Sequence, residues 1–104
     1  MTKKDLTDLF QNSLKNSLPY LDFSGDDVVV IIDTFLSVLS ESIANGNEVK
    51  LRDFGTFKTK IRKEKEVKTP TINNKILLKE TAIPIFKPGK YLKKITEERF
   101  QKKN

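Results

Sequence analysis

The fold class is decided by residues 48–67, which read EVKLRDFGTFKTKIRKEKEV. Apolar residues alternate with polar ones from Val49 to Phe57, which is the period of a β-strand with one buried face. The Phe54-Gly55 pair predicts a bend or a bulge in this strand. After Phe57 the apolar face fades, and basic residues recur at every second position. The stretch therefore predicts strands that begin against a core and continue into solvent.

The returning strand is predicted at KILLKETAIPIF, residues 75–86, after a turn region at 69–74. A hairpin over residues 58–82 is too long and too polar to lie wholly on the body, so we expect it to protrude. Such a hairpin is marginal in water until something holds it. Its basic residues are either contacts to a polyanion or a solvated edge that deters aggregation. The candidate contacts are Lys58, Lys60, Arg62, Lys65, Lys68 and Lys75.

A short helix is predicted after the returning strand, with Pro88 at its first position. The tail at residues 96–104 either extends this helix or frays. A helix N-terminus carries partial positive charge, so cations there are unfavourable unless an anion is bound. Free N–H groups and lysines at one helix start favour the same anion. The stretch therefore predicts a phosphate clamp at Lys87, Lys90, Lys93 and Lys94.

Two helices are predicted in the first half of the chain. Their starts are marked by capping-box patterns at Thr2 with Asp5 and at Ser24 with Asp27. Apolar residues at helical spacing place the first helix over residues 3–16. The second helix runs to Asn45-Gly46, a favourable helix stop.

The second helix contains VVVII, residues 28–32, which favours a strand by propensity. A capped helix of about twenty residues is ordinary, whereas a strand of that length is rare, so we predict a helix. Ten of the 16 residues at 28–43 are apolar. One apolar stripe suffices for a surface helix, so this helix needs cover on more than one side. A second copy of the chain would supply that cover, and we expect a homodimer.

Charge is distributed unevenly along the 104 residues. Residues 1–46 carry three basic and seven acidic side chains, a net charge of −4, whereas residues 47–104 carry 17 and seven, a net charge of +10. This asymmetry points to a polyanion, either nucleic acid or an anionic membrane. A hairpin carries the basic residues, whereas membrane surfaces bind amphipathic helices, so we expect no membrane contact.

Several classes of site are disfavoured by composition. The chain has no cysteine and no histidine, which removes disulfides, thiolates and the commonest general base and metal ligand. No carboxylate pair accompanies a glycine-rich phosphate loop. No apolar run reaches the roughly 18 residues of a membrane span, and the basic N-terminus lacks a signal-peptide core. We expect an intracellular protein that is not an enzyme and holds no cofactor or metal.

Three features together resemble the bacterial histone-like HU/IHF family of DNA-binding proteins. They are VKLRDFGTF at 49–57, the proline at position 70 and IPIFKPGKYLKK at 83–94. The resemblance implies an α+β fold: two N-terminal helices, a three-stranded antiparallel sheet with a protruding β-hairpin arm, and a short C-terminal helix. It also implies an intertwined homodimer whose arms enter the DNA minor groove, with Pro70 as the wedge that kinks the duplex.

The arm tip departs from the family pattern, a glycine-containing Arg-Asn-Pro-Gln-Thr-Gly. This chain has Lys68 for the arginine, Thr69 for the asparagine and Asn73 for the second glycine. Lysine and arginine are not equivalent in a narrow groove, because the guanidinium is flat and donates several hydrogen bonds. The connection between the first two helices and the C-terminal tail are also longer than usual for the family.

The resemblance implies one domain over residues 1–104: a helical dimerisation half at 1–46, a saddle sheet with arm 58–82 and C-terminal helix at 47–96, and a tail at 97–104. The expected function is low-specificity binding, bending and compaction of double-stranded DNA in the cytoplasmic nucleoid. Two alternatives stay open: a site-specific IHF-type factor, with a paralogous subunit as partner, and an RNA-binding or scaffold protein. The expected DNA-binding residues are Lys58, Lys60, Arg62, Lys65, Lys68, Pro70, Lys75, Lys87, Lys90 and Lys93.

Overall fold

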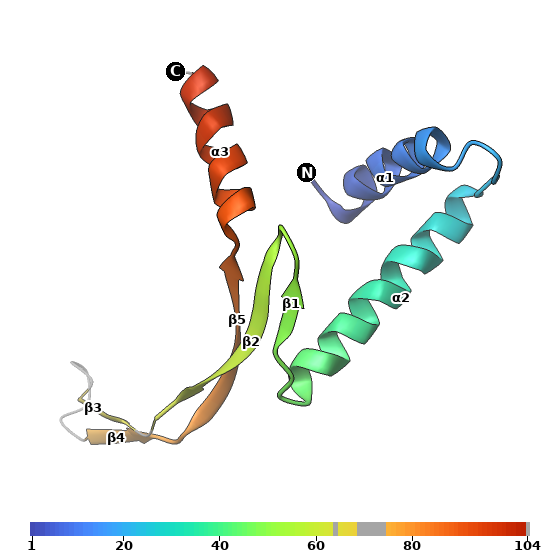
Figure 1. The fold of residues 1–104 in the computed structure, drawn as a ribbon. Helices are drawn as coiled ribbons and strands as arrows, with labels where there is room; N and C mark the ends of the chain where they lie inside the picture. The colour runs from blue at the N-terminus through green and yellow to red at the C-terminus, as the bar shows by residue number, and fades with distance from the viewer. Residues whose placement is uncertain (64, 69–74, 104) are drawn as a thin grey trace. The chain divides into compact units, whose positions relative to one another are not determined.

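The fold is shown in Figure 1 as a computed structural model, which describes residues 1–63, 65–68 and 75–103. The elements follow in the order α1, α2, β1, β2, β3, β4, β5, α3. The predicted order of two helices, an antiparallel sheet and a C-terminal helix is confirmed. The chain divides into two compact units, residues 1–40 and 41–104.

Helix α1 (Lys3–Ser17) begins at the predicted capping box. The Thr2 amide donates to Asp5 Oδ2 at 3.0 Å, and the Asp5 amide donates to Thr2 Oγ1 at 3.4 Å. These bonds satisfy two backbone donors that the first turn leaves free. The start predicted from the sequence is therefore correct.

Helix α2 (Gly25–Ala44) contains the VVVII segment, so helix was the correct choice over strand. A second capping box forms here: the Asp27 amide donates to Ser24 Oγ, and the Ser24 amide donates to Asp27 Oδ2. The helix ends at Ala44, and Gly46, two residues further on, has a φ of 85° that suits a residue without a side chain. Capping at both ends thus overrides the β-propensity of the valines and isoleucines.

Few side chains are buried in the helical unit. Gln11 Nε2 donates to the Phe23 carbonyl at 3.2 Å and ties the connection to α1, while Lys3 and Asp33 form an ion pair. Val28 is fully buried, and it is the only hydrophobic side chain that is buried among the residues whose burial the structure describes. No helix in the described part of the chain is long and apolar enough to cross a membrane.

The second unit is built on an antiparallel sheet with strand order β1-β2-β5. Its strands are β1 (Val49–Leu51), β2 (Gly55–Arg62) and β5 (Thr81–Pro88). The predicted bend at Phe54-Gly55 is the turn between β1 and β2, where Asp53 has a φ of 64° and the Phe54 amide donates to the Leu51 carbonyl. Aspartate is one of the few residues that tolerate this left-handed conformation.

Strands β2 and β5 continue well past the end of β1. Strand β1 pairs only with residues 55–57 of β2, whereas the β2–β5 ladder runs from Gly55 opposite Pro88 to Arg62 opposite Thr81. Beyond β1, residues 58–62 therefore have a strand neighbour on one side only. This extension of the ladder is the base of the predicted protruding hairpin (Figure 1).

The returning strand is split in two, where the sequence predicted one strand over 75–86. Strands β3 (Lys65–Lys68) and β4 (Lys75–Leu78) form a separate two-stranded ladder, and Lys79-Glu80 separates β4 from β5. Lysine and glutamate have low β-propensity, and here they interrupt the ladder.

Helix α3 (Lys90–Lys103) corrects one expectation and decides one open choice. Pro88 is the last residue of β5 and not the first of the helix. The Lys93 amide donates to the Gly89 carbonyl at 3.1 Å, so Gly89 is the cap. The helix has 14 residues and includes most of the tail, which resolves the open choice in favour of extension.

Candidate nucleic-acid interface

One face of the sheet carries a row of basic residues, because successive side chains on a strand point to opposite faces. The register places Lys87 of β5 opposite Thr56, and Thr56 opposite Lys50 of β1. Lys58, Lys60 and Arg62 follow Thr56 at every second position of β2. We call this the basic face, and its members are Lys50, Lys58, Lys60, Arg62 and Lys87.

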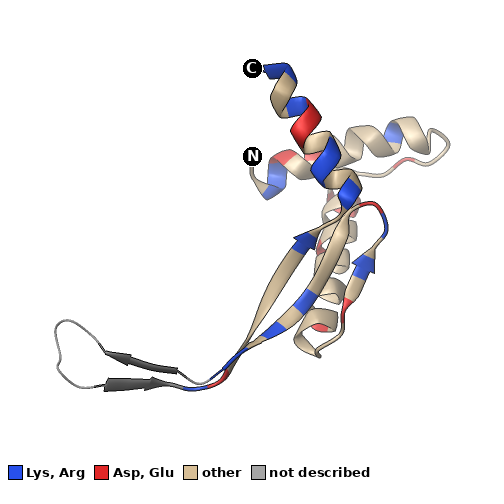
Figure 2. Cartoon of the chain, turned by 60° about the vertical axis from the view of Figure 1, so that its left-hand side comes forward, with Lys and Arg blue, Asp and Glu red and all other residues tan. Residues whose placement is uncertain are grey.

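The spacing of the basic face suits a phosphate backbone. Residues two apart on a strand are about 6.6 Å apart, so Lys58 to Arg62 spans about 13 Å. Each DNA strand presents a phosphate about every 3.4 Å of helix axis, so this row can face several phosphates at once. Figure 2 shows the blue Lys and Arg bands that follow the β2–β5 ribbon.

The charge of the basic face is largely unneutralised. Neither β2 nor β5 contains an acidic residue. The side-chain ion pairs in the described part of the chain join Lys3 to Asp33 and Lys50 to Glu48, the latter at 3.9 Å. Lys60, Arg62 and Lys87 are exposed, and Lys58 is half-buried. The face is therefore a cationic surface without an internal counterion along its main ladder.

The opposite side, which we call the aromatic face, holds the residues that support this row: Val49, Leu51, Phe57, Ile61, Pro84 and Phe86. Phe57 and Phe86 are direct cross-strand partners with ring centroids 4.6 Å apart. Phe54, from the turn, lies 5.4 Å from Phe86 and 6.4 Å from Phe57. These separations are typical of stabilising aromatic pairs. The phenylalanines therefore have structural roles in the sheet.

Gly55 is required by the close packing of the aromatic face. A Cβ atom at this position would lie 2.6 Å from the Phe86 ring and 2.7 Å from the Lys87 carbonyl oxygen. A backbone oxygen cannot move aside without disturbing the ladder. The glycine therefore allows Phe86 to lie over β2, and it holds Lys87 in register on the other face.

The sheet is fastened to the end of α2 through the aromatic face. Thr59 Oγ1 donates to the Ile43 carbonyl at 3.0 Å. Thr59 lies between Lys58 and Lys60, so this bond fixes the side of β2 that faces the helix end. The two lysines consequently project to the other side.

The start of α3 forms a second cationic group. Gly89 has no side chain to cap the helix, and the first turn of α3 contains no acidic residue, unlike the first turns of α1 and α2. Lys90, Lys93 and Lys94 lie at positions i, i+3 and i+4, which share one face of a helix. The Gly89 amide donates to the Phe54 carbonyl at 2.9 Å, which fixes this helix start to the β1–β2 turn.

The structure brings together some of the residues predicted as the site. Lys58, Lys60, Arg62 and Lys87 share the basic face, whereas Lys90 and Lys93 lie on α3. Lys65, Lys68 and Lys75 lie in the β3–β4 ladder, where Lys68 is opposite Lys75. Pro70 lies outside the described residues. Their roles in binding stay predictions.

Lys50 is a member of the basic face that the sequence reasoning missed. It lies on a different strand from the other lysines, two residues before the β1–β2 turn at residues 52–54. The register aligns Lys50 with Thr56 and Thr56 with Lys87, which puts it in the same row. A period of two continued from Lys50 to Lys58 gives the same face, so this signal in the sequence could have found it.

The described residues contain no group of three acidic or other metal-ligating side chains that would hold a metal ion. The chemistry available on the basic face is the binding of anions by ammonium and guanidinium groups. Such groups form charge-assisted hydrogen bonds with phosphate oxygens.

Comparisons with known proteins agree with this geometry. The chain is 42% identical over 67 residues to the DNA-binding protein HU of Thermus thermophilus, which covers 64% of this chain and 69% of that protein. It is 33% identical over 99 residues to the integration host factor subunit beta of Paraburkholderia xenovorans, covering 95% and 87%.

The fold matches that of an Anabaena HU–DNA cocrystal structure with a TM-score of 0.76. At 24% identity, the match covers 92% of this chain and 97% of that chain, and it concerns the fold alone. The sequence model for bacterial DNA-binding proteins matches residues 1–97. The chain therefore belongs to the bacterial DNA-binding protein family, as a relative of HU and of the integration host factor subunits.

Proposed function

We propose that this protein is a homodimeric architectural protein that binds double-stranded DNA with little sequence preference, bends it and compacts it in the bacterial nucleoid. The observation that carries this proposal is the basic face, a row of cations on a ladder free of acidic residues. Counterion release from DNA supplies most of the binding free energy of such a surface. The protein acts by binding and has no catalytic role.

Low sequence preference follows from the chemistry of the basic face. Four of its five members are lysines, which contact phosphates as compact point charges. Phosphate contacts position a protein on the duplex but carry no direct sequence information. The face presents no asparagine or glutamine, the residues that read adenine by paired hydrogen bonds.

Dimerisation is supported by the apolar surface that one chain leaves uncovered. Val30 is 62% exposed, Val38 is 61% exposed and Phe35 is 55% exposed, all on α2. Exposed apolar surface of this extent is typical of a protein interface. Sedimentation at several protein concentrations tests the dimer, and a monomer at every concentration would contradict it.

We expect the two chains of the dimer to contact each other through the faces of their helices and sheets and not through the edges of their sheets. Strand β1 has only three residues, and β5 carries Pro84 and Pro88. Short edge strands and prolines both prevent edge-to-edge pairing.

A salt series tests the proposed binding mechanism. With six to ten phosphate contacts, the affinity for duplex DNA should fall by about 10³ to 10⁵-fold between 50 and 200 mM salt. Fluorescence anisotropy with a random-sequence duplex measures this affinity at each salt concentration. A flat response would overturn the mechanism. Competition with duplex RNA and with single strands separates DNA binding from an RNA-binding function.

A site-specific factor is a second candidate, favoured by the similarity to an integration host factor subunit over 95% of the chain. This candidate allows a paralogous chain as the second subunit. Competition between a random duplex and sites selected from genomic fragments distinguishes a site-specific factor from a low-specificity architectural protein. Specific binders discriminate by typically 10³-fold or more, whereas a low-specificity protein should show a ratio near one.

Pro70 is proposed, from the family resemblance, as the wedge at the arm tip. A wedge between base pairs unstacks and kinks the duplex. Pro70→Ala should therefore reduce DNA bending more than it reduces affinity, as measured by energy transfer between dyes on the duplex ends. The neighbouring Thr71→Ala is the matched control. Unchanged bending in Pro70→Ala would show that no wedge acts here.

A further inference from the structure

The basic face also contains two isoleucines beside its cations. Ile83 and Ile85 lie two residues apart on β5, so they point to the same side of the sheet. Ile83 is the cross-strand partner of Lys60, and Ile85 is the partner of Lys58. Both isoleucines are half-buried. We call them the isoleucine pair, and they lie next to the row of cations on β2.

The isoleucine pair occupies the middle of the face along the β2–β5 ladder. At each end of the ladder a threonine lies opposite a cation: Thr81 is opposite Arg62, and Thr56 is opposite Lys87. A threonine hydroxyl can both donate and accept a hydrogen bond. The two middle cross-strand pairs contain only lysine and isoleucine, and an ammonium group donates but does not accept. The middle of this face therefore offers no side-chain acceptor to a hydroxyl group.

The isoleucine pair lies one strand spacing, about 4.8 Å, from the cations of β2. In a nucleic acid the sugars adjoin the phosphates, so a strand whose phosphates contact Lys58 and Lys60 can bring its sugars over the isoleucine pair. Ribose carries a 2′-hydroxyl where deoxyribose carries only hydrogens, and this group distinguishes RNA from DNA. Burying a hydroxyl against isoleucine without a hydrogen-bond partner is unfavourable. Deoxyribose packs on the same surface without this cost.

We infer that the isoleucine pair makes this protein select duplex DNA over duplex RNA, by packing on the deoxyribose of the strand that the β2 cations bind. The inference rests on the proposed function and adds the residues that choose between two polyanions. The cations do not make this choice, because both duplexes present phosphates and lysine contacts a phosphate as a point charge. The choice therefore depends on the uncharged part of the face.

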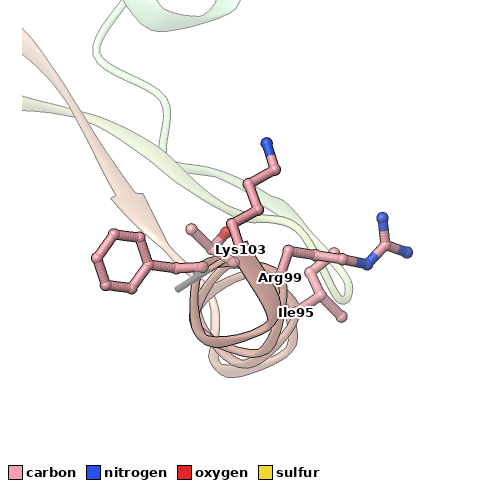
Figure 3. A pocket seen from close by; sticks show the side chains of 5 residues that line it. Ile95, Arg99 and Lys103 are labelled. Atoms are coloured by element: carbon pink, nitrogen blue, oxygen red, sulfur yellow. The ribbon is translucent and has the colours of Figure 1, made fainter.

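A second place where isoleucine adjoins cations is a shallow hollow at the end of α3. It is lined by Ile95, Thr96, Arg99, Phe100 and Lys103. Figure 3 shows the side chains of Arg99 and Lys103 pointing in different directions around the helix. Cations that diverge in this way do not form a row along one phosphate backbone, and the Thr96 hydroxyl can accept a hydrogen bond from ribose. The hollow therefore lacks both properties that the isoleucine pair has on the sheet.

Two double variants of the full-length protein test the inference. Ile83→Val/Ile85→Val keeps both side chains apolar, and Ile83→Thr/Ile85→Thr has the same branching at Cβ but carries a hydroxyl in place of one methyl group. The threonine variant should raise the ratio of RNA affinity to DNA affinity at least about fivefold over the valine variant, which is the effect of one ordinary hydrogen bond. Fluorescence anisotropy with DNA and RNA duplexes of one sequence, at one salt concentration, measures this ratio.

Further controls separate the hydroxyl from other causes. Ile61→Thr, on the aromatic face, should leave the ratio unchanged. A duplex of 2′-fluoro RNA keeps the A-form shape of RNA but has no 2′-hydroxyl, so the gain of the threonine variant should vanish with it. Circular dichroism and urea denaturation check that each variant is folded under the binding conditions. The parent protein needs no substitution, and it should prefer DNA over RNA at least about tenfold.

The outcomes separate this inference from the proposed function. A parent protein whose DNA binding does not depend on salt overturns the proposed function and the inference together. A parent protein that binds DNA and RNA equally, with a steep salt dependence for both, overturns the selection of DNA alone. Equal RNA-to-DNA ratios in the valine and threonine variants also overturn it, because the isoleucine pair then does not sense the sugar. A gain that persists with 2′-fluoro RNA assigns the effect to duplex shape and overturns it as well.

Discussion

The two faces of the β2–β5 ladder differ in composition, although the same two strands form both. One face carries the cations Lys58, Lys60, Arg62 and Lys87 together with Ile83 and Ile85, whereas the other carries Phe57, Ile61, Pro84 and Phe86 and no charged residue. Neighbouring residues such as Phe57 and Lys58 therefore serve different purposes. The aromatic face stabilises the sheet, and the basic face presents charge that folding alone does not require.

The contrast between the two faces predicts how substitutions in β2 affect folding and DNA binding. Changes on the aromatic face should lower the free energy of unfolding, and DNA affinity should fall only as far as folding does. Changes on the basic face should lower DNA affinity and its salt dependence while leaving unfolding almost unaltered. A basic-face variant that lowers the free energy of unfolding along with DNA affinity would break the division between the two faces.

The largest effect is expected for Phe57→Ala on the aromatic face. Phe57 has ring neighbours at 4.6 and 6.4 Å, so its removal leaves a cavity between Phe86 and Phe54. Loss of a packed phenylalanine costs about 3–5 kcal/mol in the free energy of unfolding. Urea denaturation at one protein concentration measures the loss. Thr56→Ala, on the basic face, is the control and should cost under about 1 kcal/mol.

Removing the β2 cations together should have the next largest effect. In a Lys58→Gln/Lys60→Gln/Arg62→Gln variant, the slope of log affinity against log salt should fall by about 2.7 for each chain that contacts DNA. Affinity at low salt should drop at least about 100-fold, which is about 2.7 kcal/mol. All duplex sequences should be affected alike. A change in sequence preference without a change in slope would show that these residues read bases.

The sequence was sufficient for much of this structure because its local signals agree. The capping boxes at Thr2 and Ser24 and the stop at Gly46 predicted both N-terminal helices against the β-propensity of residues 28–32. The period of two in β2 likewise placed Lys58, Lys60 and Arg62 on one face. Where several local rules point to one answer, the prediction is secure.

The remaining features depend on pairing between distant residues, which periodicity does not encode. Pro88 suits both a helix start and a strand end, and its pairing with Gly55 decides for the strand. Cross-strand register places Lys50 in one row with Thr56 and Lys87.

A smaller loss of stability is expected when a methyl group is added to Gly55. Because its Cβ would meet both the Phe86 ring and the Lys87 carbonyl, Gly55→Ala should cost about 1–3 kcal/mol. Gly25→Ala is a matched control, since nothing lies within 4 Å of a Cβ there. That control should be neutral or stabilise by up to about 1 kcal/mol. Equal losses for the two variants would show that the aromatic face is not closely packed around Gly55.

Lys50→Gln should have the smallest effect, and it tests whether the basic face extends onto β1. Lys50 is 3.9 Å from Glu48, which already offsets part of its charge, so its loss should cost less DNA affinity than the loss of Lys60. The salt slope should fall by no more than about 0.9 per chain. Glu48→Gln is the complementary variant, and it should raise affinity slightly by freeing Lys50 for phosphate. If Lys50→Gln leaves the slope unchanged while Lys60→Gln lowers it, the interface ends at β2 and register alone does not define the surface.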